Sequence, residues 1–155
     1  MNSHDLQRFI DIHQIQAVIL PMDCHTPTVP DAARALGVAS RQIIKSLVFM
    51  VKDSPLLVIG CGEARIDSRK LAALFSVSRG RVKMASAQKA FDITGYVVGS
   101  MPPFGHRRKL PTVVDSVVPE METIFGGGGD VDAMMRLSTD ELLRTTEAQV
   151  ASISE

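Results

Sequence analysis

Residues 40–60 read SRQIIKSLVFMVKDSPLLVIG, and this stretch decides how the rest of the chain is interpreted. It begins polar and then enters an apolar run from Leu47 to Val51, which is typical of a strand entering a hydrophobic core. Ser54 and Pro55 are turn-forming residues, and the run LLVIG at 56–60 follows them directly. The pattern predicts two antiparallel neighbours joined by a short turn, and therefore a sheet at the centre of the fold.

Outward from this pair, apolar spacing and capping residues predict the other elements. Pro30 suits a first helical turn that Gly37 closes, and Ser138 with Glu141 forms a capping-box pattern. We expect helices at 3–16, 30–36, 70–75, 86–91 and 139–146, and strands at 18–22, 81–84, 112–118, 122–125 and 132–137. Mixed helices and strands predict one α/β domain over residues 1–155, built around a mixed sheet.

The composition, with 45% hydrophobic and 22% charged residues, is ordinary for a soluble globular chain. No apolar run approaches the roughly 20 residues that span a bilayer, and the N-terminus lacks the pattern of a signal peptide. We therefore expect a cytoplasmic protein with no membrane partner. Cys24, His25 and Cys61 could form a zinc site, but no CxxC or HExxH motif accompanies them, so we expect no metal and no cofactor.

The net charge of the chain is zero, but the charges are unevenly distributed. Residues 65–109 hold ten Lys or Arg against two acids, a local net of +8, while residues 1–64 sum to −1 and residues 110–155 to −7. Such a basic middle could attract phosphate if its side chains share one face, or it could form ordinary solvated helix faces.

The stretch GSMPPFGH at 99–106 combines rigidity with exposed main-chain groups. Pro102 and Pro103 fix their own φ and bias the residues before them toward extended backbone, while Gly99 and Gly105 allow sharp bends. A backbone preset in this way can present carbonyl and N–H groups to a small polar ligand. The same pattern is also typical of a rigid surface turn, and the residues alone leave both interpretations open.

Two other features leave alternatives open. Lys45 lies between Ile43-Ile44 and the apolar run, where it could extend its side chain to solvent at a strand end or fix a phosphate at the mouth of a pocket. The run GGGG at 126–129 could allow close backbone approach or form a flexible hairpin tip. It lacks the Lys and Ser/Thr of a P-loop, and the chain shows no nucleophile elbow of the Gly-x-Ser-x-Gly type.

Taken together, these motifs resemble the YbaK/prolyl-tRNA synthetase-associated (ProX-like) editing family, over roughly residues 18–152. The similarity lies in the order of the segments, which are TVPDAARALGV (28–38), QIIKSLVF (42–49), LLVIGCGEARIDSRKLAAL (56–74), TGYVVGSMPPFGH (94–106), TVVDSVV (112–118), the glycine run and LSTDELLRTT (137–146). The resemblance implies a mixed, partly barrel-like sheet flanked by helices. It also implies trans-editing: hydrolysis of the ester of a mischarged tRNA, with aminoacyl-tRNA as the partner, a possible role for prolyl-tRNA synthetase, and no DNA.

The resemblance also implies which residues act. Lys45, at the family's invariant lysine, would hold the 3′-terminal phosphate or the aminoacyl group, and Gly99 would take part in catalysis. The remaining expected substrate-binding residues are Thr28, Ser46, Ser100, Met101, Pro102, Pro103, Phe104, Gly105, His106, Gly126, Gly127 and Gly128.

The chain departs from the family at one point. Many relatives have a basic pair in the last loop, where this chain has Gly128, Gly129 and Asp130, which puts a tRNA contact there in doubt. The sequence leaves open whether alanine, cysteine, serine or threonine is removed, and from which tRNA. It also leaves open a non-catalytic module that binds tRNA or a synthetase, and a small-molecule sensor.

Overall fold

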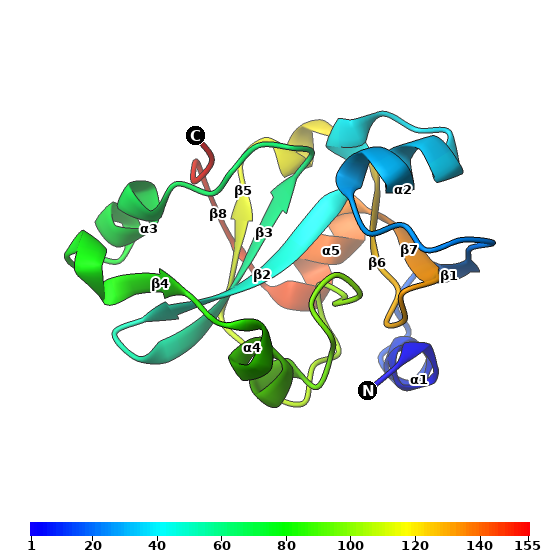
Figure 1. The fold of residues 1–155 in the computed structure, drawn as a ribbon, viewed down its shortest axis with the longest axis horizontal. Helices are drawn as coiled ribbons and strands as arrows, with labels where there is room; N and C mark the ends of the chain where they lie inside the picture. The colour runs from blue at the N-terminus through cyan, green and yellow to red at the C-terminus, as the bar shows by residue number, and fades with distance from the viewer.

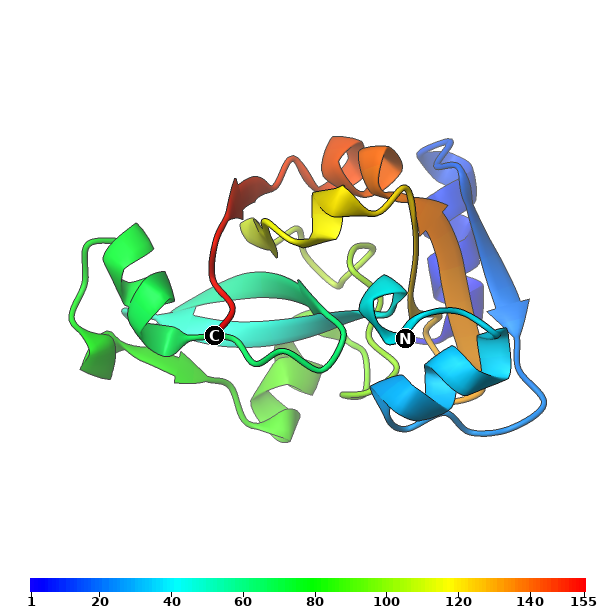
Figure 2. The same ribbon diagram turned by 90° about the horizontal axis from the view of Figure 1, so that it is seen from above.

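The computed structural model describes all residues, 1–155, as two β-sheets with five α-helices (Figure 1). The five-stranded sheet has the order β4-β2-β3-β5-β8, and the three-stranded sheet has the order β1-β7-β6. The long β2–β3 pair extends through the molecule toward β4 and α3 at one end and toward the smaller sheet and α2 at the other (Figures 1 and 2).

The predicted central pair is confirmed. Strand β2 (Ile44–Val51) runs antiparallel to β3 (Ser54–Cys61), with Lys45 opposite Gly60. Short β4 (Val82–Met84) adds to β2 on the other edge. Strands β5 (Thr112–Asp115) and β8 (Gln149–Ala151) continue the sheet in parallel beyond β3. Strand β8 is absent from the sequence-based expectations.

The smaller sheet contains β1 (Ala17–Pro21), β6 (Thr123–Gly127) and β7 (Ala133–Ser138), all paired antiparallel. A single bridge between Ile43 and Phe125 brings the start of β2 next to β6. The two sheets do not close into a barrel. The expected mixed α/β fold is confirmed, and its barrel-like character is limited to this junction.

The helices are α1 (Ser3–Ile12), α2 (Val29–Leu36), α3 (Ser68–Leu74), α4 (Ala87–Thr94) and α5 (Thr139–Thr146). Short 3-10 turns lie at Ser40–Gln42 (η1), Arg79–Arg81 (η2) and Val118–Glu120 (η3). Ser86 and Ser138 accept main-chain N–H groups as N-caps, as their positions in the sequence predict. No helix is long and apolar enough to cross a membrane.

Two expected elements are too long. The first helix ends at Ile12 rather than residue 16, because Gln14 takes a φ of 54°, outside the helical region. The strand expected over 112–118 ends at Asp115, since Val118–Glu120 forms η3 with Pro119 in its first turn. The carboxylate of Asp115 then accepts main-chain N–H groups from Ile153 and Ser154, which attaches the end of the chain to this sheet.

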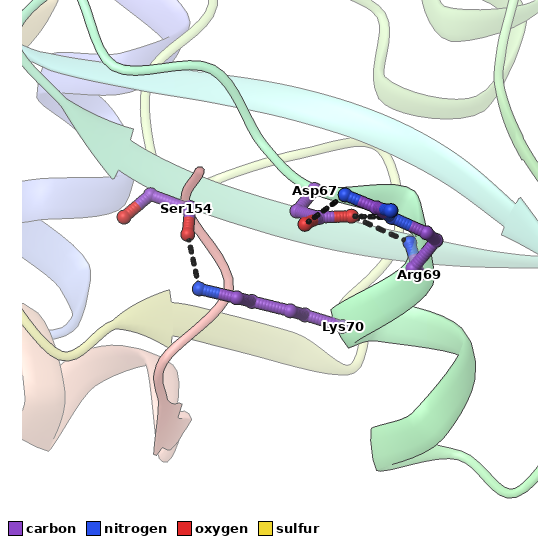
Figure 3. A network of polar contacts seen from close by, with 4 residues as sticks. All are labelled: Asp67, Arg69, Lys70 and Ser154. Atoms are coloured by element: carbon purple, nitrogen blue, oxygen red, sulfur yellow. Dashed lines mark hydrogen bonds and ion pairs between the residues drawn. The ribbon is translucent and has the colours of Figure 1, made fainter.

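The start of α3 is also tied to the end of the chain (Figure 3). Asp67 caps the helix by accepting the Arg69 N–H at 2.9 Å, and its pKa is lowered mainly by its hydrogen bonds with Arg69. The Lys70 ammonium donates to the carbonyl of Ser154 at 2.7 Å. Two cations of the basic middle, Arg69 and Lys70, therefore already have protein partners.

Candidate functional site

A cavity of about 440 Å³ lies where four parts of the chain meet. They are residues 26–32 at the start of α2, residues 43–47 at the start of β2, the loop residues Val98, Gly99 and Met101, and a small contribution from β6 and β7; Glu63, which follows β3, also lines the cavity. Among the residues expected to bind substrate, the cavity brings together Thr28, Lys45, Ser46, Gly99, Met101 and Gly127. We call this space the front cavity.

The α2 wall is fixed by its own capping. Thr28 is the N-cap, and its hydroxyl accepts the Asp31 N–H at 3.2 Å and donates to the Asp31 carboxylate at 2.7 Å. Pro30 lies in the first turn, and Gly37 ends the helix with a φ of 67°. Thr28 therefore has a structural task as well as a place in the front cavity.

Lys45 is the one cation in the front cavity. Its ammonium donates to the carbonyl of Ala64 at 3.3 Å, and no carboxylate lies within 4 Å of it. Its positive charge is therefore not neutralised by an ion pair. Glu63 is the only carboxylate among the lining residues. The segment GCGEAR that contains it was part of the resemblance, but sequence reasoning gave Glu63 no role because an isolated Glu shows no catalytic spacing.

The loop side is held by close backbone packing. Gly99 has a φ of 96°, which favours glycine. The carbonyl of Ser100 accepts the Gly129 N–H at 2.9 Å. A Cβ at Gly127 would lie 2.3 Å from the Met101 carbonyl oxygen, so β6 and the loop touch directly. The glycine run thus serves close approach, because Gly126 and Gly127 belong to β6 rather than to a flexible tip.

The other expected residues of GSMPPFGH lie elsewhere. Pro103, Phe104 and His106 line a second space of about 360 Å³, together with Phe9, Lys109 and residues of α5. We call it the rear cleft. The remaining expected residues line neither space: Ser100, Pro102, Gly105, Gly126 and Gly128. Of these, Ser100 donates its hydroxyl to the Val97 carbonyl at 2.8 Å.

At three other expected site glycines, neighbouring atoms leave little room for a side chain. Gly105 has a φ of 76° and packs against the ring of Phe9, while Gly126 faces Ile44 and Gly128 faces the main chain of Ala133. The loop consequently has two faces, with Gly99 and Met101 at the front and Pro103, Phe104 and His106 at the rear. Side-chain direction along an irregular loop follows no simple period, so the sequence could not divide these residues between two spaces.

The front cavity offers a specific combination of groups. The carbonyls of Gly99 and Met101 accept no hydrogen bond from the protein, whereas Pro102 and Ser100 carbonyls do. The walls include apolar side chains from Ile44, Leu47 and Met134. A cation, free carbonyl acceptors and apolar walls suit a small organic group that is joined to a polar, anionic one. No group of three or more His, Cys, Asp or Glu side chains that could hold a metal ion is present, and Cys24 is exposed while Cys61 is buried.

A separate group of positively charged side chains lies at the C-terminal end of β2. Lys52, Arg81 and Lys83 line a depression of about 220 Å³ with Gly80 and one acid, Asp53. None of the three cations forms an ion pair within 4 Å, unlike Arg69 with Asp67 or Lys109 with Glu147. We call Lys52, Arg81 and Lys83 the basic tip. Part of the basic middle is thus gathered at one place, and part of it is neutralised elsewhere.

Comparison with known proteins identifies the family. The sequence pattern of the aminoacyl-tRNA editing domain matches residues 24–145, which include every residue that lines the front cavity. The chain belongs to the aminoacyl-tRNA editing domain family. This confirms the resemblance seen in the sequence, and the front cavity is therefore a cavity of an editing domain.

Similar proteins agree with this family. A crystal structure described as "a putative trans-editing enzyme for prolyl tRNA synthetase" superposes on the editing domain with a TM-score of 0.92 and 28% identity, covering 99% of this chain and 96% of that one. The "Putative Cys-tRNA(Pro)/Cys-tRNA(Cys) deacylase EbsC" of Enterococcus faecalis is 26% identical over 123 residues, 79% of this chain and 74% of that protein. The proline–tRNA ligase of Thermoanaerobacter sp. (strain X514) is 21% identical over 134 residues, 84% of this chain but 24% of the ligase.

Proposed function

We propose that the protein is a trans-editing deacylase that hydrolyses the ester between a tRNA and a wrongly attached small amino acid. The observation that supports this most is the lining of the front cavity, which combines Lys45, whose ammonium has no ion pair, with Gly99 and Met101, whose carbonyls accept no hydrogen bond from the protein. The names of the similar proteins favour tRNA-Pro as the tRNA and cysteine as one amino acid, and we extend the proposal to alanine or another small amino acid. The reaction would take place in the cytoplasm, where charged tRNA is used.

In the reaction we propose, the protein acts mainly by positioning the substrate and the attacking group. Ester hydrolysis passes through a tetrahedral oxyanion, and no histidine lines the front cavity to act as a base. The carbonyls of Gly99 and Met101 would accept hydrogen bonds from the attacking water or from the 2′-OH of the terminal ribose. Lys45 would anchor the 3′-terminal phosphate or the aminoacyl group and place positive charge near the developing oxyanion. For a cysteine substrate, the thiol of the substrate could attack the ester itself.

The front cavity also provides a basis for selecting small amino acids. A synthetase pocket separates side chains that differ by one methylene by only about 1–3 kcal/mol, so a second site with a size limit adds fidelity. Met101, Ile44 and Leu47 are among the apolar side chains in the lining. Phe104 is buried behind the loop, so we assign the size limit to Met101 and its apolar neighbours instead.

The basic tip would bind the body of the tRNA. From Lys45 to Lys52 the chain advances seven residues, or about 23 Å at the rise of a β-strand. This separation would allow the 3′ end to enter the front cavity while phosphates of the acceptor stem meet Lys52, Arg81 and Lys83. Unpaired cations attract phosphate without sequence preference, and such binding weakens with salt.

A non-catalytic module that binds charged tRNA or prolyl-tRNA synthetase is the second candidate. The lack of a histidine in the front cavity favours it, since Glu63 is the only side chain there that could act as a general base. The two candidates differ in turnover. With charged tRNA in excess, an enzyme releases many equivalents of free amino acid, whereas a binding module protects the ester.

The test is a panel of tRNA-Pro species charged with alanine, cysteine, serine, threonine and proline. We expect multiple turnovers on at least one small non-cognate amino acid and little on proline. Lys45→Ala should lower kcat/KM about 100-fold, because it removes the only cation of the front cavity. Lys89→Ala is the matched control, since Lys89 is exposed on α4 outside the front cavity. Full activity of Lys45→Ala on every active substrate would remove Lys45 from the mechanism.

A further inference from the structure

The loop at residues 101–106 has unusually little main-chain support. None of its main-chain groups forms a hydrogen bond with another main-chain group of the protein, and Pro102 and Pro103 have no N–H to donate. Nevertheless Met101 and Phe104 are almost completely buried in the largest hydrophobic cluster. The direction of the peptide groups in this loop must therefore be fixed by side chains.

The His106 side chain supplies the one hydrogen bond that reaches this backbone. Its Nε2 lies 2.8 Å from the carbonyl oxygen of Pro102. A carbonyl oxygen only accepts, so Nε2 carries the hydrogen and donates it. Burial lowers the pKa of His106, which keeps the ring neutral at neutral pH with Nδ1 unprotonated. One half-buried donor thus holds the carbonyl of the residue that directly follows Met101.

The ring of His106 is itself held in place. It packs edge-on against Tyr96, with 6.1 Å between ring centroids, and Tyr96 is fully buried. Phe104 stacks on Phe9 of α1 at 5.9 Å. These contacts lie on the rear side of the loop, and His106 lines the rear cleft but not the front cavity. His106 can therefore act on a substrate in the front cavity only through the loop.

We propose that His106 is a positioning residue, whose hydrogen bond to the Pro102 carbonyl sets the orientation of the neighbouring peptide groups of Gly99 and Met101, two residues that line the front cavity. This inference rests on the proposed function and changes the role expected from the sequence, where His106 was a substrate-binding residue. A hydrogen-bond donor on the rear face would then be needed for the rate of the chemical step and not for the affinity for tRNA.

The test compares His106→Phe, which keeps a ring but removes the donor, with His106→Gln, whose amide can place a donor near the position of Nε2. Thr145→Val is the matched control, because Thr145 lines the same rear cleft and its hydroxyl forms no hydrogen bond. We expect His106→Phe to lower kcat about 10-fold or more with little change in KM, since small misplacements of reacting groups are costly. His106→Gln should restore most of kcat, and Thr145→Val should behave as the original protein.

A second measurement does not depend on activity. The Gly129 N–H donates to the carbonyl of Ser100, so its hydrogen exchange reports whether the loop stays attached to the glycine run. We expect faster exchange of this amide in His106→Phe than in His106→Gln or Thr145→Val. Equal kcat and equal exchange in the Phe and Gln variants would overturn the inference, as would a rise in KM with kcat unchanged. If the unaltered protein deacylates no tRNA, the proposed function fails, and the exchange measurement still decides whether His106 positions the loop.

Discussion

The two ends of strand β2 differ in almost every physical property. At the start of the strand, the front cavity of about 440 Å³ has several apolar side chains in its lining and one cation without an ion pair, Lys45. At the other end, the basic tip borders a depression of about 220 Å³ whose lining has three cations without ion pairs and one hydrophobic residue, Met50. The first arrangement can distinguish the shape of a small group, whereas the second can only attract negative charge.

Under the proposed function, this difference corresponds to two tasks, which are the selection of an amino acid and the binding of the tRNA. Selection of an amino acid requires lining groups that are held in fixed positions. The glycine run contributes to this, because its lack of side chains allows β6 to pack directly against the loop backbone. Holding a tRNA of any sequence needs charge without precise geometry. Changes at the start of β2 should therefore affect the chemical step, and changes at the basic tip should affect binding and its salt dependence.

The largest effect is expected from Gly127→Ala. Its new Cβ would lie 2.3 Å from the Met101 carbonyl oxygen and 2.8 Å from that of Ser100, and both neighbours are backbone atoms that cannot rotate away. The loop has to move, so we expect kcat/KM to fall about 100-fold and the free energy of unfolding to fall by about 1–3 kcal/mol. Deacylation kinetics and chemical denaturation measure the two effects.

The matched control for this change is Gly80→Ala at the basic tip. A Cβ there would meet nothing within 4 Å, and Gly80 has no positive φ. We expect unchanged kcat and unfolding free energy. Similar losses of kcat and of unfolding free energy in both variants would show that the backbone near the start of β2 is no more constrained than the backbone near its end. The contrast between the two ends of the strand would then be wrong.

A smaller effect is expected when charge is removed from the basic tip. In the double variant Arg81→Ala, Lys83→Ala, the plot of log Kd against log salt for uncharged tRNA-Pro should become shallower by about 2, with kcat at saturating tRNA unchanged. The control pair is Arg69→Ala, Lys70→Ala, because those cations are already engaged by Asp67 and Ser154 (Figure 3). An unchanged slope in the tip variant would place the tRNA body elsewhere.

Features set by local sequence were predicted well. The β2–β3 pair, the end of α2 at Gly37 and the N-cap of α5 at Ser138 all depend on neighbours within a few residues. Contacts between distant segments were not predicted. Strand β8 joins β5 across more than thirty residues, and its three residues, Gln149–Ala151, show no strand pattern of their own. Val117 and Val118 resemble strand residues, but Pro119 ends the pairing.

The site was predicted in part for the same reason. Sequence reasoning named Lys45, Gly99 and Met101, which the fold does bring to one cavity. It could not assign His106 to the rear cleft, because that depends on how the loop packs between α1 and Tyr96. It also missed the basic tip as a unit, since Lys52 lies outside the basic middle in sequence and joins Arg81 and Lys83 only through the pairing of β2 with β4.

The smallest expected effect concerns Asp130, which follows the glycine run. Its carboxylate accepts the Ser3 N–H at 3.0 Å at the start of α1, and this hydrogen bond holds the pKa of Asp130 below its ordinary value of 3.8. The charge stabilises the N-terminus of the helix, so Asp130→Asn should lower the free energy of unfolding by about 0.5–1 kcal/mol at pH 7.

The pH dependence of this difference follows from the direction of the pKa shift. A lowered pKa in the folded protein means that the stabilisation is present above the ordinary value of 3.8 and is lost as the pH falls through the lower folded pKa. The two proteins should therefore differ in urea denaturation at pH 7 and converge as the pH falls through the folded pKa of Asp130, below 3.8. Because Asp130 lies at neither end of β2, the salt slope for tRNA should stay unchanged in Asp130→Asn. A markedly steeper slope would mean that this carboxylate faces the phosphates, and that the tRNA crosses the glycine run as well as the basic tip.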